Sequence, residues 1–119
     1  MKYMLLIYGD EHALDQTERE RCYGESSELA RDLAANGQFL STAPLHATAT
    51  ATSVRVRGGK RQVTDGPFAE TREQLGGYFL VEAEDIDEAI EIAGRIPGAK
   101  WGTVEVRPVV ELAGLPLPG

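Results

Sequence analysis

Two segments in which every residue is apolar constrain the fold of this chain more than any other feature. Residues 3–8 read YMLLIY, and residues 78–81 read YFLV. Runs of this kind lack the polar alternation of a strand with one wet face, so they predict central strands that are covered on both faces. A sheet built around them needs a layer of structure on each side.

The rest of the chain supplies a regular order of elements. Thr17 and Glu20 form a possible capping box for a helix that is expected to end near Asn36, with Cys22, Leu29, Ala30 and Leu33 on its inner side. Residues 38–45 are predicted to form a strand. Valines alternate with arginines around Gly58-Gly59, which predicts a hairpin.

The C-terminal third repeats the strand–helix–strand pattern. Asp85 and Glu88 predict the start of a second helix, and residues 103–107 alternate as in an edge strand. The expected inner stripe of this helix is Ile86, Ala89, Ile90, Ala93 and Ile96.

This order predicts an α+β protein with a ferredoxin-like split βαβ fold and an inserted β-hairpin. Its antiparallel sheet has two helices on one face. Residues 1–112 are expected to form a single domain, and residues 113–119 an extended C-terminal tail. The second sheet face is expected to meet a second copy across a two-fold axis, which gives a homodimer. In the alternative, a monomer, the 47–52 tract and the tail fold over that face.

Composition narrows the partners and the compartment. A net charge of −7 argues against a nucleic-acid partner. The single cysteine cannot form an intrachain disulfide, and the N-terminal apolar run is too short for a signal peptide or a membrane span. A cytoplasmic protein without a membrane partner is expected.

No cofactor or metal site is predicted. His12, His46 and Cys22 do not stand at a recognised ligand spacing, and the two Gly-Gly pairs lack the strand–helix context of a phosphate loop. Cys22 lies on the apolar stripe of the first helix, which favours a buried structural thiol.

Residues 64–71, TDGPFAET, are the candidate site. Gly66 tolerates unusual φ values and Pro67 fixes its own, so a stiff loop would hold the Asp65 carboxylate as a general base or polar clamp. Phe68 is expected to anchor the loop by packing down, and Glu70 and Glu73 to share one helical turn. In the alternative interpretation, the motif only shapes a turn and fixes strand register.

The other candidate residues surround this loop. His46 follows a strand end, where loops often border clefts, so it is a candidate catalytic partner of Asp65. Ordinary solvation is the alternative for His46. Glu70 and Arg72 are candidate substrate contacts, and Phe68 and Tyr78 are candidate aromatic walls.

Three segments together resemble the DGPF branch of the YCII-related family: MKYMLLIYGDE at the start, residues 49–93 around TDGPFAETREQLGGYFLV, and GTVEVRPV near the end. The resemblance implies a ferredoxin-like fold of the dimeric α+β barrel group. It also implies a histidine–aspartate mechanism, with one relative a dehydrochlorinase of a chlorinated hydroxyquinone. The family histidine would lie on the first helix, which has none here, so His46 or His12 would have to replace it.

Two functions are therefore expected. The first is a dimeric protein that binds an unidentified small molecule, with acid–base activity of lyase or hydrolase type at the DGPF loop. The alternative is a non-catalytic regulatory or interaction module, because the DGPF branch is associated with extracytoplasmic-function sigma factors. The second hypothesis implies a sigma-factor-related protein as a possible partner. A cofactor-free monooxygenase, as in other dimeric barrels, has little support from the one tryptophan and two histidines.

Overall fold

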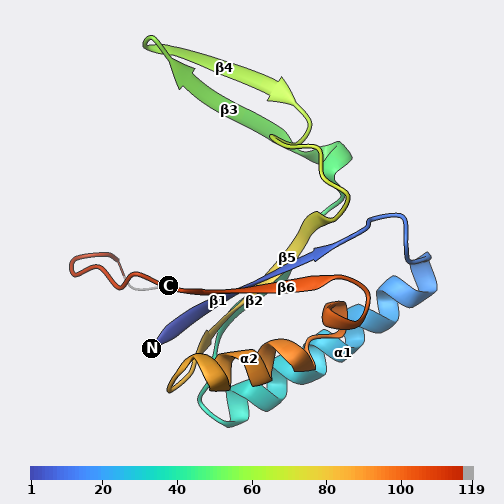
Figure 1. Cartoon of the computed structure of the whole chain (residues 1–119), viewed down its shortest axis with the longest axis vertical. Coiled ribbons are helices and arrows are strands. Elements are labelled where there is room, and N and C mark those ends of the chain that lie inside the picture. The colour runs from blue at the N-terminus through green and yellow to red at the C-terminus, as the bar shows by residue number, and fades with distance from the viewer. Residues whose placement is uncertain (117–119) are drawn as a thin grey trace.

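The computed structural model describes residues 1–116 and contains the predicted order of elements. Four strands form an antiparallel sheet in the order β2-β5-β1-β6, and both long helices lie on one side of it (Figure 1). This is the ferredoxin-like α+β fold that the sequence predicts, with the hairpin inserted between β2 and β5. The elements are β1 (Lys2–Gly9), α1 (Gln16–Ala35), β2 (Phe39–Pro44), the 3₁₀ turn η1 (Thr48–Thr50), β3 (Thr52–Arg57), β4 (Lys60–Asp65), β5 (Gln74–Glu82), α2 (Ile86–Arg95), the 3₁₀ turn η2 (Pro97–Lys100) and β6 (Thr103–Pro108).

The two apolar runs form the two central strands. They pair antiparallel, with Leu5 opposite Phe79 and Leu6 opposite Tyr78. Because side chains alternate along a strand, each run divides between the two faces of the sheet. The residues that face the helices are buried, whereas those on the opposite face are only half-buried: Tyr3, Leu5, Phe79 and Val81 belong to the first set, and Met4, Leu6, Tyr78 and Leu80 to the second. We call the second set the open face.

Helix α1 begins two residues earlier than the sequence predicts. Asp15, not Thr17, is its N-cap: the Asp15 carboxylate accepts a bond from the Glu18 amide at 2.8 Å, and the Glu18 carboxylate accepts one from the Asp15 amide. Asp15 and Glu18 have the same capping-box spacing as Thr17 and Glu20, and aspartate is at least as good an N-cap as threonine. Starting at the earlier pair adds about half a turn of helix. Helix α1 ends at Ala35, and Gly37 adopts a left-handed φ of 72°.

Helix α2 starts at the predicted cap, because the Asp85 carboxylate accepts a bond from the Glu88 amide at 2.9 Å. Its buried stripe differs from the prediction in two positions. Ile86 and Ile90 are 43% and 54% exposed, and Ile92 is buried instead. The buried side of α2 includes Ala89 and Ile96. Ile90 follows Ala89 by one residue, which is about 100° of rotation around the helix, so its side chain turns away from the core.

Strands β3 and β4 form a two-stranded hairpin that projects from the body on the side away from the helices (Figure 1). We call residues 52–65 the arm. Its turn is the predicted Gly58-Gly59 pair, which takes left-handed φ values of 57° and 75°. Such a turn matches the twist of the two strands.

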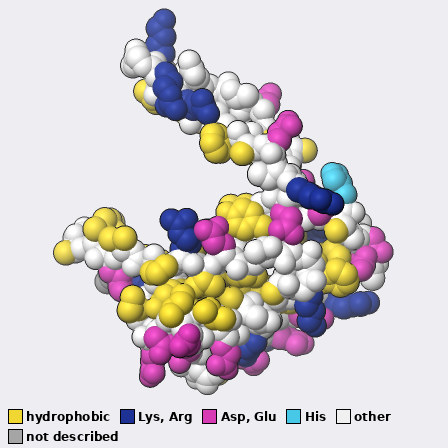
Figure 2. All heavy atoms as spheres, viewed as in Figure 1, with side chains coloured by type: hydrophobic (Ala, Val, Ile, Leu, Met, Phe, Trp, Pro, Cys, Tyr) yellow, Lys and Arg dark blue, Asp and Glu magenta, His cyan; other side chains and the backbone are white. Residues whose placement is uncertain are grey.

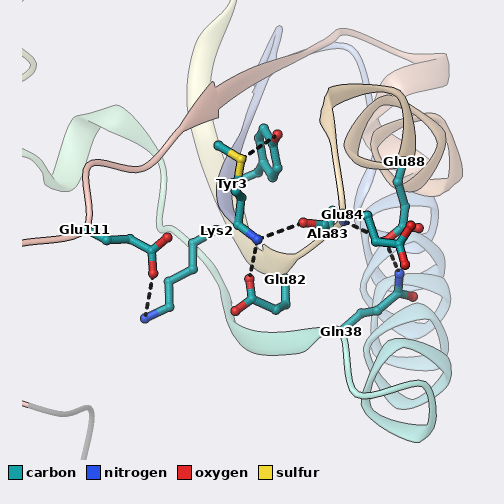
Figure 3. A network of polar contacts seen from close by, with 9 residues as sticks. Lys2, Tyr3, Gln38, Glu82, Ala83, Glu84, Glu88 and Glu111 are labelled. Atoms are coloured by element: carbon teal, nitrogen blue, oxygen red, sulfur yellow. Dashed lines mark hydrogen bonds and ion pairs between the residues drawn. The ribbon is translucent and has the colours of Figure 1, made fainter.

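Polar contacts join the N-terminus to the end of β5, and the start of β2 to α2 (Figure 3). The Met1 ammonium group donates to the Ala83 carbonyl oxygen at 2.9 Å and lies 3.2 Å from the Glu82 carboxylate. Gln38 donates to Glu88 at 2.9 Å, which ties the start of β2 to the start of α2.

Beyond β6, Val109 donates its amide to the Lys2 carbonyl oxygen, and residues 110–116 contain no helix or strand. This segment runs away from the sheet, and the 47–52 tract lies near the base of the arm (Figure 1). Within residues 1–116, these two segments therefore do not cover the open face. The last three residues of the predicted tail, 117–119, lie outside the described residues.

Candidate functional site

A cavity of ≈ 1180 Å³ opens on the helix side of the sheet, at the end where β1 stops and α1 begins. Ile7, Phe79 and Ile96 line it from the core. The loop after β1, the segment 44–50 after β2 and the segment 66–71 before β5 complete its wall. The cavity has the size of a small-molecule cleft.

The first half of α1 explains why this space is not filled. The helix turns one face to the cavity, with Cys22, Ser26 and Ala30 at successive turns. Farther along, the same side carries Leu29 and Leu33, which are buried in the core. The small side chains at positions 22, 26 and 30 thus leave a space beside this face of the helix, whereas Leu29 and Leu33 fill the core.

Two glycines also shape the wall. A Cβ atom on Gly77 would lie 2.9 Å from the Ala43 carbonyl oxygen, and one on Gly98 would lie 2.7 Å from the Cγ2 atom of Ile7. Both glycines line the cavity. Here they allow β2 and the η2 turn to approach the central strands closely.

Both histidines of the chain border the cavity. His12 comes from the loop after β1, and His46 from the segment after β2. Each is exposed to solvent. An imidazole can act as a general acid or a general base, so these two side chains are candidate acid–base groups of the cavity.

Glu11 fastens the two histidine-bearing segments together. Its carboxylate accepts a bond from the Thr48 amide at 2.6 Å and another from the Thr48 hydroxyl at 2.9 Å. The Glu11 amide donates to the Gln74 side chain at 3.1 Å, and Arg19 donates to the Glu11 carbonyl oxygen at 3.1 Å. The residue next to His12 is therefore bonded to a residue two positions from His46.

The predicted site residues divide into two groups. His46 and Glu70 line the cavity, together with Gly66 and Pro67 of the DGPF motif. Asp65, Phe68, Arg72 and Tyr78 are not part of the lining.

Tyr78 points to the open face, because its neighbour Phe79 takes the helix side. Its hydroxyl lies 2.9 Å from the Ser41 hydroxyl. Phe68 does not pack down as predicted: it is 78% exposed, and its ring lies 5.6 Å from the Arg55 guanidinium carbon. An aromatic ring beside a guanidinium keeps a favourable contact even in solvent.

Asp65 is exposed at the last position of β4, opposite Thr52. Gly66 has a φ of 101°, as a glycine-dependent turn requires, and its amide donates to the Ala51 carbonyl oxygen at 2.7 Å. The segment 66–73 contains no helical turn, so Glu73 does not share one with Glu70. Instead, Glu73 accepts a bond from the Thr103 hydroxyl at 2.9 Å.

Several lining residues were missed or discounted at the sequence level. Glu11, Tyr23 and Trp101 line the cavity, and so does His12, which the sequence does not place beside the DGPF loop. The available signal was the polar run of residues 9–12 after a buried strand, together with small residues on the inner side of α1. Trp101 is the only tryptophan of the chain and is 54% exposed.

Cys22 also lines the cavity, and burial raises the pKa of its thiol above the ordinary value, with the charge of Glu25 adding to the effect. A neutral thiol is a poor nucleophile. Among residues 1–116, no group of three or more histidine, cysteine or acidic side chains is placed to hold a metal ion. Within the same residues, no helix has the length and hydropathy needed to cross a membrane.

Comparisons with known proteins agree with the fold. Residues 1–113 match the YCII-related domain. An uncharacterised protein of Rhizobium meliloti (strain 1021) is 37% identical over 114 residues, which cover 92% of each chain. Among solved structures, 5-chloro-2-hydroxyhydroquinone dehydrochlorinase (TftG) from Burkholderia phenoliruptrix AC1100, in complex with 2,5-dihydroxybenzoquinone, superposes with a TM-score of 0.55. It is 15% identical, over 92% of this chain and 94% of that one, so this likeness concerns the fold. The chain belongs to the YCII-related family.

Proposed function

We propose that this protein binds a small cyclic organic molecule in the cavity and exchanges a proton with it through His46 or His12. The observation that carries the proposal is the meeting of both histidines at one cavity whose floor is apolar. An apolar floor binds a ring, and a few polar groups at the rim orient it.

The proton step needs only the side chains of the rim. A neutral imidazole takes a proton from an acidic C–H group of the bound molecule. In an elimination, the electron pair of that bond forms a C=C bond, and a leaving group on the adjacent carbon departs with its own bonding pair as an anion. Glu70 at the rim would favour the imidazolium that forms.

The positions of the two histidines support this mechanism on a chain whose α1 has no histidine. The Glu11–Thr48 contacts hold together the two segments that carry His12 and His46. A general base needs such a fixed position. In this proposal Asp65 acts indirectly, through the turn that starts the 66–71 wall. A direct role as base or clamp would require its carboxylate to turn towards the cavity.

The solved relative guides the choice of ligand. TftG is described in complex with 2,5-dihydroxybenzoquinone, a small hydroxylated ring. A cavity of ≈ 1180 Å³ has room for a ring of that class. We therefore take hydroxylated benzenes and quinones as the first ligands for this chain.

The test is calorimetric titration of the full chain with 2,5-dihydroxybenzoquinone and with hydroquinone, supported by Trp101 fluorescence. We expect binding at micromolar to millimolar concentration, weakened about tenfold or more by Ser26→Trp, which fills the cavity. His46→Ala and His12→Ala, with Arg31→Ala at an exposed position of α1 outside the cavity lining as the control, locate the proton acceptor. Heats that are zero for both compounds, or that Ser26→Trp leaves unchanged, would overturn the proposal. Asp65→Ala distinguishes a direct carboxylate role from the indirect one.

A further inference from the structure

The arm has two chemically different faces. In the β3–β4 register, Val54 pairs with Val63 and Val56 with Arg61, so the three valines share one face. The other face carries Arg55, opposite Gln62. The face with the three valines also carries Arg61, opposite Val56, and Asp65 at its base, whereas Arg55, Arg57 and Lys60 lie on the other face. A hairpin whose apolar residues all lie on one face has the pattern of a sheet that is covered on that side.

Nothing within residues 1–116 covers the valine face. Val54, Val56 and Val63 are 58%, 61% and 57% exposed, and all six residues of β4 are exposed. An isolated two-stranded hairpin is marginally stable in water. The arm therefore has an apolar face of the kind that packs against another surface.

The chain also contains a matching apolar surface, which is the open face of the sheet. Met4 and Leu80 pair across β1 and β5 there, as do Leu6 and Tyr78. Figure 2 shows hydrophobic side chains on the arm and on the body, on the two sides of an open notch. The valine face of the arm and the open face of the sheet are both apolar, so each can cover the other.

Charge adds a second match. The arm carries four cations, Arg55, Arg57, Lys60 and Arg61, and one carboxylate, Asp65, so its net charge is +3. The chain as a whole has −7, which leaves −10 for the remaining residues. A basic arm is attracted to the acidic body of another copy of the same chain.

The arm of a given copy is held away from its own sheet. At its base, the Gly66 amide donates to the Ala51 carbonyl oxygen, and the Ser53 hydroxyl donates to the Gly66 carbonyl oxygen at 2.8 Å. Folding the arm back over its own open face would bend it at this base. A second copy can enter the notch without breaking either bond.

We propose that the arm packs its valine face on the open face of a second copy of this chain, and that the two copies exchange arms. A two-fold axis makes the exchange reciprocal, so each open face receives one arm and each arm is covered. The arm is thus the element that holds the pair together.

Sedimentation velocity of the full chain at several concentrations tests this assignment. Val63→Asp places a carboxylate on the valine face, and Gln62→Asp places the same charge one residue away on the opposite face. We expect Val63→Asp to weaken self-association by about tenfold or more, and Gln62→Asp to change it by less than about threefold. Equal effects of the two variants, or a wild-type chain that stays monomeric, would overturn the proposal. Circular dichroism checks that both variants keep the fold.

A cross-link distinguishes exchange between copies from folding back. In a Cys22→Ser background, cysteines replace Val56 on the arm and Leu6 on the open face, and a short bifunctional maleimide joins them. A product with the mass of two chains supports arm exchange. An intrachain product, or cross-linking that needs an added different protein such as a sigma factor, would overturn it.

Discussion

The contact between Glu11 and Thr48 gives the sharpest test of how the cavity is built. The Glu11 carboxylate accepts two bonds, at 2.6 Å from the Thr48 amide and at 2.9 Å from the Thr48 hydroxyl. Both residues are half-buried. A bond to a charged group contributes about 1.5–3 kcal/mol, and partial exposure reduces this value. We expect Glu11→Ala to lower the free energy of unfolding by about 2–3 kcal/mol.

The hydroxyl bond can be separated from the amide bond. Thr48→Val keeps the shape of the side chain and the backbone amide but removes the hydroxyl, so the expected loss is about 1 kcal/mol. A double-mutant cycle with Glu11→Ala should give a coupling energy of about 1 kcal/mol, because the two side chains act through one shared bond. Urea unfolding followed by Trp101 fluorescence measures all four proteins of the cycle.

The control is another carboxylate that makes a single exposed contact. Glu73 accepts one bond from the Thr103 hydroxyl, and its removal should cost less than about 1 kcal/mol. The reasoning fails if Glu11→Ala and Glu73→Ala lose equal stability, or if the cycle gives no coupling. A genuine contact also predicts that Glu11→Ala changes the NMR signals of both histidines, which Glu73→Ala leaves in place.

Two further predictions concern residues of the cavity wall. Because burial and the charge of Glu25 raise the pKa of the Cys22 thiol, its thiolate is scarce at neutral pH. Alkylation by iodoacetamide, followed by intact mass, should therefore be slower than for a free thiol, rise with pH beyond the ordinary thiol range, and be faster in Glu25→Gln. Gly77→Ala should destabilise the fold by about 1–3 kcal/mol in urea, because its Cβ would lie 2.9 Å from the backbone oxygen of Ala43. Gly94→Ala, inside α2 with nothing within 4 Å of the new methyl, should instead stabilise it by up to about 1 kcal/mol. Equal signs for the two glycine variants would contradict the packing argument.

Most of the fold followed from the sequence because local and long-range signals agreed. The two apolar runs, the Asp85 cap and the Gly58-Gly59 turn each predicted the element that the structure contains. The errors occurred where two neighbouring residues satisfied the same rule. Asp15 and Thr17 both start a capping box, and Ile90 and Ile92 both extend an apolar stripe of α2.

The site was less predictable because the cavity depends on the absence of large side chains at its position, not on a motif. A cavity forms where the inner residues of α1 are small, and no periodicity shows that the opposing loops leave the space unfilled. The DGPF motif predicts a stiff loop that presents the Asp65 carboxylate to a cleft. The structure instead places the following residues, Gly66 and Pro67, in the wall and leaves Asp65 exposed on the arm.

That placement gives the DGPF motif a single physical role in both proposals. Gly66 ends the arm through its bond to Ala51, and it also begins the wall segment that leads to Glu70. If a second copy holds the arm as proposed, the angle at which the wall segment 66–71 leaves the arm would be restricted. Restricting the wall would raise the affinity of the cavity for a ligand that fits the restricted shape. By linkage, that ligand would raise the affinity of the two copies for each other by the same factor. A short, conformationally limited segment such as Asp-Gly-Pro-Phe suits this position, because a flexible one would transmit nothing between the arm and the cavity.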